Sequence, residues 1–234
     1  MIKRFKVLGV VLAVVGLGFI GGGVYAYTQV QAGYESLEKF SAAQNVVLTY
    51  NEDGQLVDRG EVEGAQAILS LLQDDWGYQV KASELTADDP LVNTASEYMY
   101  QMALVAYHTL HSTQTVTLTE DVEYNGTTYE AGTYEFDVDG RYWADFDRQH
   151  PIEGAARSQA WTATAHALIG ELGVGSVTAS TLQLGTGVAG FMAGVGSVFI
   201  LLGLGLVWAA AGDKKRPALK EAPAIEKIDE TVSI

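Results

Sequence analysis

The chain has 234 residues, no cysteine and a formal net charge of −15 at pH 7. The absence of cysteine excludes disulfide bonds, so a folded domain must be held together by its core. The acidic balance argues against nucleic acid as a partner, because phosphates need a basic surface, and it favours cations or basic protein surfaces. A merely soluble acidic surface is the alternative interpretation.

A first uncharged run extends from Val7 to Tyr27 and follows three basic residues. Because a bilayer core needs about 20 apolar residues, this run predicts a transmembrane helix at 7–27, with 1–6 as a cytoplasmic N-terminus. A signal peptide cleaved near Val30-Gln31-Ala32 is the alternative. We favour an uncleaved anchor, because the apolar run exceeds the roughly 7 to 15 residues of a signal-peptide core.

The next segment, 28–183, contains 24 acidic and six basic residues, which gives it a net charge of −18. β-Prone residues around an Asn-Glu-Asp-Gly turn predict a hairpin at 46–59. Apolar residues at helical spacing predict a helix at 62–73. A second helix, at 94–110, is expected to begin with the capping box Thr94-Ala95-Ser96-Glu97.

From 114 to 146, apolar and polar residues alternate. Asn125-Gly126 and Asp139-Gly140 supply the positive φ angles of tight turns, so the pattern predicts antiparallel hairpins. A further helix is expected at 154–172, ended by Gly173-Val174-Gly175. The segment is therefore predicted to be an α+β domain of helices and antiparallel hairpins, flanked by N- and C-terminal transmembrane helices.

A second uncharged run of twenty-eight residues occupies 184–211 and is followed by Asp213-Lys214-Lys215-Arg216. It predicts a second transmembrane helix, with 212–234 as a disordered cytoplasmic tail. Lysine and arginine beside a span stay on the cytoplasmic side. Both termini are therefore expected to be cytoplasmic, and 28–183 is expected to lie outside the plasma membrane.

Each predicted span contains two glycines four residues apart. Helices in lipid need small residues where their backbones approach each other. An antiparallel hairpin would bring the two glycine pairs to the same depth, so we expect the helices to pack through Gly18, Gly22, Gly190 and Gly194. Glycine is also common in spans generally, which is the alternative explanation.

The densest polar and aromatic cluster follows the Asp139-Gly140 turn. At strand spacing, alternate side chains would share one face, which could bind a partner or pair two carboxylates for acid–base chemistry. Ion pairing that only fixes the loop is the alternative. The candidate binding surface comprises Arg141, Tyr142, Trp143, Asp145, Asp147, Arg148 and His150.

Two other groups are weaker candidates for metal binding. His108 and His111 lie three apart at a helix end, but no spacing supplies the remaining ligands. Asp137-Val138-Asp139-Gly140 does not meet the spacing of a calcium loop, and a turn explains it better. We therefore predict no metal and no cofactor.

The chain contains three distinctive motifs: YNEDGQLVDRG at 50–60, SEYMYQM at 96–102 and DGRYWADFDRQHP at 139–151. With the span–domain–span layout, they resemble a group of uncharacterised two-span actinobacterial membrane proteins. Looser relatives of that layout carry the label of an aromatic ring-opening dioxygenase. The resemblance implies an exported domain of unknown function and carries over no catalytic residue.

These patterns predict a non-catalytic interaction or accessory module of an envelope or membrane assembly. Its partners would be the lipid bilayer and another membrane or envelope protein. Two tethers restrict a domain's orientation, which suits a scaffold more than a free enzyme. The alternative is a membrane-anchored hydrolase or metal-dependent enzyme that uses the Arg141–His150 segment, above all Asp145, Asp147 and His150.

Overall fold

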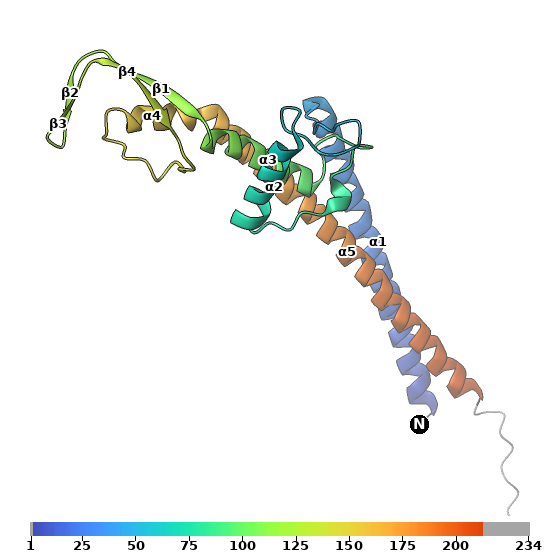
Figure 1. Ribbon diagram of the computed structural model, residues 1–234. Helices are drawn as coiled ribbons and strands as arrows, with labels where there is room; N and C mark the ends of the chain where they lie inside the picture. Colours follow the sequence, from blue (N-terminus) through green and yellow to red (C-terminus); the bar gives the residue numbers. More distant parts are fainter. Residues whose placement is uncertain (1, 213–234) are drawn as a thin grey trace, which may run out of the picture. The chain divides into compact units, whose positions relative to one another are not determined.

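The computed structural model describes residues 2–212 and has an α+β fold with a long apolar helix at each end (Figure 1). The predicted α+β class, with antiparallel hairpins and two long apolar helices, is thereby confirmed. The predicted tail beyond Gly212 lies outside the described residues. The elements are α1 (Ile2–Gln44), α2 (Val62–Ser70), a π-helical turn (Leu71–Asp75), a 3₁₀ turn (Ala82–Glu84), α3 (Ala95–Leu110), β1 (Thr113–Leu118), β2 (Val122–Tyr124), β3 (Thr127–Tyr129), β4 (Gly132–Asp137), α4 (Glu153–Ala160) and α5 (Ala163–Gly212).

The chain divides into two compact units. The first combines Met1–Ala26 with Val188–Ile234, and the second is Tyr27–Gly187. Helices α1 and α5 each contribute to both units, because each is continuous through the point of division. We call these the helix-pair unit and the central unit.

Both end helices continue further into the central unit than the sequence pattern predicts. The pattern places a linker around Gly33 and a break at 173–175, yet these glycines lie inside continuous helix. A β-carbon on Gly33 would lie 2.5 Å from Leu182, and one on Gly175 would lie 2.5 Å from the Tyr98 ring. The absence of a side chain at Gly33 and Gly175 therefore permits close packing instead of ending a helix.

In the helix-pair unit, α1 and α5 pack antiparallel along a seam of small residues. A β-carbon on Gly9 would lie 2.5 Å from the carbonyl oxygen of Gly203, and one on Gly16 would lie 2.5 Å from that of Gly196. The backbones are therefore in contact, and the repeat of seven residues is the period of a left-handed helix pair. The seam consists of Gly9, Gly16 and Gly23 on α1 and Ala189, Gly196 and Gly203 on α5.

The seam does not use the glycines that the four-residue spacing predicts. β-Carbons on Gly18, Gly190 and Gly194 would meet nothing within 4 Å, and one on Gly22 would meet only the end of Met192. Gly18 follows Gly16 by two residues and Gly194 precedes Gly196 by two, which is about 200° around a helix, so both face away from the seam. The predicted helix–helix contacts are corrected accordingly.

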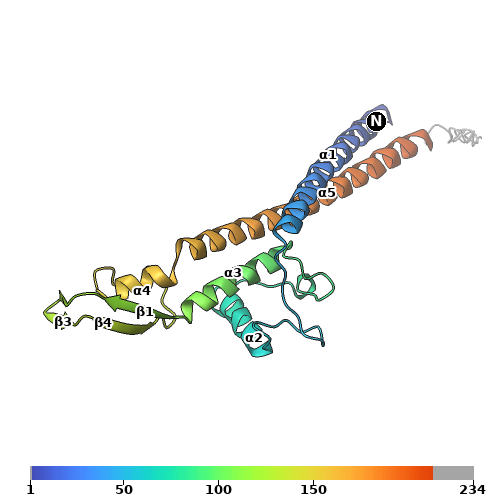
Figure 2. The same cartoon turned by 90° about the horizontal axis from the view of Figure 1, so that it is seen from above.

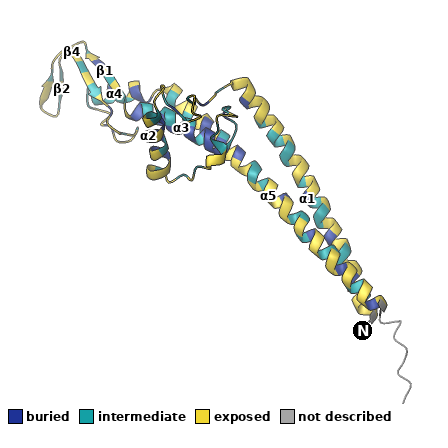
Figure 3. Ribbon diagram, turned by 45° about the vertical axis from the view of Figure 1, so that its right-hand side comes forward, coloured by how far each residue is buried: buried dark blue, intermediate teal, exposed yellow. Residues whose placement is uncertain are grey.

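Outside the seam, most of the apolar surface of the helix pair is exposed (Figure 3). Only 17% of the most apolar stretch of α1, and 11% of that of α5, is buried within the protein. Both helices are long and apolar enough to cross a membrane. A core helix of a water-soluble protein would be mostly buried instead, because its apolar face must leave water.

Helix α3 is the centre of the main core of the central unit. Tyr100 and Ala103 on α3 pack with Ile68 of α2, with Leu72 of the π-helical turn and with Leu172 of α5. All five residues are buried. Apolar residues at helical spacing therefore bring these helices together, as the 3.6-residue period predicts.

The predicted capping box at the start of α3 is confirmed. The Thr94 hydroxyl accepts a hydrogen bond from the Glu97 N–H, and the Glu97 carboxylate accepts one from the Thr94 N–H at 2.8 Å. Glu97 is 1% exposed. Burial raises the pKa of its carboxyl group, against hydrogen bonds from Asn93 and Thr94 that favour the charged form.

Two antiparallel strand pairs follow α3 (Figure 2). β1 pairs with β4 and β2 pairs with β3. The Asn125-Gly126 turn joins β2 to β3 with φ angles of 49° and 77°, as predicted. Asp139 and Gly140 also have positive φ, but no strand returns after them. The chain instead continues through turns into α4, which packs on β1.

The seam generates a first prediction. Gly16→Ala should destabilise the helix pair by about 1–3 kcal/mol, because the new methyl group overlaps the Gly196 carbonyl. Gly18→Ala, which faces open space, should leave stability unchanged or raise it slightly.

The measurement is thermal unfolding in detergent. A second readout is cross-linking of cysteines placed at Phe19 and Phe199, whose ring centroids lie 5.9 Å apart in a chain without native cysteine. Equal effects of the two alanine substitutions would contradict the seam.

Candidate functional site

The predicted surface segment, residues 141–150, forms a series of turns between β4 and α4 and is not a strand. The alternate-face arrangement expected for a strand therefore does not occur. Most of its side chains contact different neighbouring residues outside the segment. Each candidate residue is described below with its partners.

Arg141 contacts three residues outside the segment: Glu153, Phe136 and Trp161. Its guanidinium forms an ion pair with Glu153 of α4, with Nη1 and Oε1 2.5 Å apart, and lies 5.1 Å from the centroid of the Phe136 ring. Its carbonyl oxygen accepts a hydrogen bond from the Trp161 indole at 3.1 Å. Arg141 therefore links β4 to α4, and its ion-pair partner is a glutamate outside the segment.

Tyr142 and Trp143 both contact side chains outside the segment. The Tyr142 hydroxyl accepts a hydrogen bond from the Trp76 indole at 2.8 Å, and its ring stacks on Trp161. The Trp143 ring lies between the Arg157 guanidinium, 3.4 Å from its centroid, and the edge-on ring of His166. Trp143 therefore connects the loop to α4 and to the start of α5, whereas Tyr142 connects it to Trp76 and Trp161.

The two aspartates shape the turns. Asp145 accepts a hydrogen bond from the Tyr142 N–H at 2.9 Å. Asp147 accepts one from the Tyr124 hydroxyl at 2.5 Å and one from the Gln149 N–H at 3.0 Å. These bonds, the one from Tyr124 foremost, hold the pKa of Asp147 below its usual value. An ionised, hydrogen-bonded aspartate suits a turn better than a general acid.

His150 caps the chain as it enters α4. Its Nδ1 accepts hydrogen bonds from the N–H groups of Ile152 and Glu153, each at 3.2 Å, and its Nε2 lies 2.9 Å from the Tyr129 hydroxyl. An accepting Nδ1 carries no proton, so Nε2 carries it in the neutral ring. Both nitrogens are thereby engaged in structural bonds. Arg148 is exposed and has no hydrogen bond or ion pair to any residue between 2 and 212.

The other predicted candidates also have structural partners. His108 Nε2 lies 3.1 Å from Asp58, whereas His111 Nδ1 lies 2.8 Å from the Tyr107 carbonyl oxygen. The two histidines therefore have different partners. Within the described chain, no three histidine, aspartate or glutamate side chains are grouped closely enough to hold a metal ion.

These contacts generate a second prediction. Arg141→Ala should lower the stability of the central unit by about 1–3 kcal/mol, because it removes a charge-assisted hydrogen bond and leaves Glu153 unpaired. Arg148→Ala is the matched control in the same loop and should have almost no effect. Chemical denaturation followed by circular dichroism measures both variants. A stable Arg141→Ala variant would show that the ion pair does not hold the loop.

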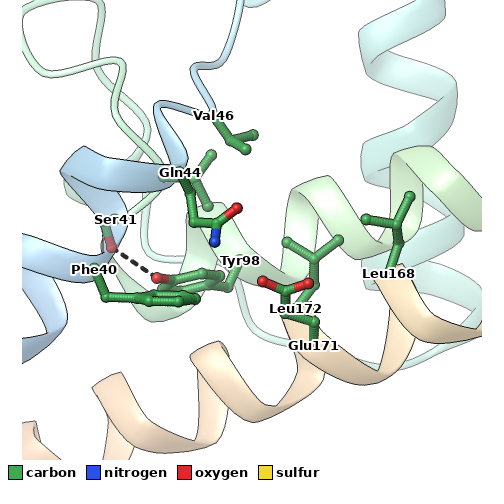
Figure 4. Close-up of a pocket in the computed structure, with 9 residues that line it drawn as sticks. Phe40, Ser41, Gln44, Val46, Tyr98, Leu168, Glu171 and Leu172 are labelled. Atoms are coloured by element: carbon green, nitrogen blue, oxygen red, sulfur yellow. Dashed lines mark hydrogen bonds between the residues drawn. The ribbon is translucent and has the colours of Figure 1, made fainter.

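A cavity that the sequence pattern does not reveal lies between the end of α1, α3 and the start of α5 (Figure 4). We call it the Tyr98 pocket; its volume is about 60 Å³. At its wall, the buried hydroxyls of Ser41 and Tyr98 hydrogen-bond to each other at 2.8 Å. The lining residues are Phe40, Ser41, Gln44, Val46, Val92, Tyr98, Leu168, Glu171 and Leu172.

Glu171 is the charged residue of the Tyr98 pocket. Its carboxylate has no hydrogen bond or ion pair to the rest of the described chain, and it lies beside apolar side chains (Figure 4). Phe40 and Leu168 are 47% and 40% exposed. The pocket therefore combines an apolar lining, two mutually satisfied hydroxyls and an unpaired negative charge.

A larger and more open cavity, of about 280 Å³, lies between α1, the loop before α3 and α5. Two carboxylates, Glu38 and Asp89, line it together with polar side chains. Asp89 also lies 3.4 Å from the Asn93 amide nitrogen. Because it is open to the surface, this cavity resembles a solvated hollow more than an enclosed ligand site.

Comparison with family models, with curated proteins and with solved structures gives no match to this chain.

Proposed function

We propose that the protein is a plasma-membrane protein whose two end helices cross the bilayer. In this proposal, the central unit is an exported, non-catalytic accessory module that binds another membrane or envelope protein. The observation that carries the proposal is the exposure of the apolar helices, since only 17% and 11% of their most apolar stretches are buried within the protein.

The helix seam supports an uncleaved first span. In lipid, the hydrophobic effect does not drive helices together, so association depends on close van der Waals packing. The contact between Gly16 and Gly196 gives both helices such a packed surface. A cleaved signal peptide would remove one side of this seam.

Charge supports the expected orientation. The basic residues Lys3, Arg4 and Lys6 precede the first apolar run, and Lys214, Lys215 and Arg216 follow the second. The intervening segment 28–183 has a net charge of −18. Under the positive-inside rule, both termini are cytoplasmic and the acidic unit is outside.

The geometry of segment 141–150 supports a structural role more than a catalytic one. Asp147 and His150 are each held by hydrogen bonds that order the loop and the start of α4. An acid–base pair needs groups free to exchange protons with a substrate. These contacts therefore do not favour the alternative function as an enzyme.

Cysteine labelling in intact cells tests this proposal. The chain has no native cysteine, so Thr117→Cys at an exposed position in β1 and Lys3→Cys near the N-terminus each give a single label site. A membrane-impermeant maleimide should label Thr117→Cys in intact cells and Lys3→Cys only after permeabilisation. The cysteine-free chain is the control.

Labelling of Lys3→Cys from outside would contradict the orientation. The accessory role is tested separately, by purification of the protein from the same cells. After extraction in mild detergent, a second protein should accompany the 25.1 kDa chain in constant proportion. A chain that always migrates alone would contradict the accessory role while leaving the topology intact.

A further inference from the structure

The Tyr98 pocket has the size of a binding site for one side chain. Its volume of about 60 Å³ is far below the roughly 300 to 1,000 Å³ of pockets that hold cofactors or drug-sized ligands. Single anchor side chains that enter small, desolvated pockets often carry much of the binding energy of a protein interface. The pocket therefore fits an interface anchor better than a small-molecule substrate.

The lining of the pocket indicates an unbranched apolar stem. Val92 and Leu172 are buried, and Leu168 and Phe40 form a partly exposed edge. The Ser41 and Tyr98 hydroxyls form a hydrogen bond with each other, so a bound side chain does not have to provide a partner for them. An aliphatic chain can thus enter without leaving these buried polar groups unpaired.

The charge at the pocket indicates a cationic end. Glu171 lines the cavity without an ion pair to the described residues, in a unit whose net charge is −18. Lysine and arginine bury their aliphatic stems against apolar surfaces while their charged ends stay at the rim. The exposed Phe40 ring adds an aromatic surface that can attract a cation.

We propose that the Tyr98 pocket binds a lysine or arginine side chain from a basic segment of a partner protein. The proposal rests on the accessory function above and names the chemistry of its partner. A second copy of the chain would bring an equally acidic unit to the same surface, which like-charge repulsion disfavours. A lipid acyl chain could fill the apolar part of the pocket but would form no ion pair with Glu171, which is exposed at its edge.

The test uses the full-length chain in detergent and three blocked tripeptides. The probes are acetyl-Gly-Lys-Gly-amide, the same peptide with norleucine, and the same peptide with glutamate. Methyl NMR of labelled leucines reads the pocket directly through Leu168 and Leu172. The lysine peptide should shift both methyl signals. The norleucine peptide, which keeps the stem but lacks the charge, should bind roughly tenfold more weakly.

Three variants separate the site from general attraction to an acidic protein. Glu171→Gln should weaken lysine-peptide binding roughly tenfold and leave norleucine-peptide binding unchanged. Glu130→Gln, at an exposed position in the loop after β3, changes the net charge equally and should have little effect. Leu168→Trp should fill the pocket and abolish the shift of Leu172, while the other leucine signals verify that the variant is folded.

Three results would overturn the proposal. Equal losses from Glu171→Gln and Glu130→Gln would indicate non-specific charge attraction. A norleucine peptide that binds as tightly as the lysine peptide would indicate an apolar or lipid occupant. Unshifted Leu168 and Leu172 signals at saturating lysine peptide would show that the pocket takes no such side chain. The titration is independent of membrane insertion, so it can fail while the cysteine labelling succeeds, or the reverse.

Discussion

The contact between Gly16 and Gly196 leaves no room for a side chain on either helix, since a β-carbon on each would lie 2.5–2.6 Å from the carbonyl oxygen of the other. Close backbone contact maximises dispersion attraction, which holds helices together where water is absent. The same contact repeats at Gly9 with Gly203. Because the two helices run antiparallel, Ala26 and Val188 leave the helix-pair unit at the same end. In the sequence, the central unit therefore connects Ala26 to Val188, two points that the seam holds near each other.

Within the central unit, small residues and buried polar groups again determine what can pack. Gly175 leaves space for the Tyr98 ring, and the Tyr98 hydroxyl bonds to Ser41 at the end of α1. These contacts place the Tyr98 pocket where three helices meet. By contrast, most charged and aromatic groups of the 141–150 loop, Arg148 excepted, form contacts within the protein, and Arg141 pairs with Glu153. Segment 141–150 is therefore mainly structural. The Tyr98 pocket, which no sequence motif marks, contains the unpaired carboxylate of Glu171.

Local features of the fold were predictable from the sequence, whereas features that depend on distant partners were not. The Thr94 capping box and the Asn125-Gly126 turn involve neighbours in sequence, so residue type alone determines them. The glycine seam depends on which helical face meets the partner, and the four-residue spacing at Gly18 pointed to the wrong face. The Tyr98 pocket joins three distant segments, and a single glutamate at 171 gives no recognisable motif.

The most direct test of the central claim is a nitroxide scan of 188–211 in lipid bilayers, with collision rates measured for oxygen and for a water-soluble nickel complex. The account predicts high oxygen access and low nickel access through most of the segment. The seam glycines stay unlabelled, because they have no room for a side chain. The account also predicts oxygen minima at Met192, Phe199 and Leu206, which contact α1 and lie seven residues apart. High nickel access throughout, or oxygen access without a seven-residue period, would contradict a membrane-spanning helix pair packed along this seam.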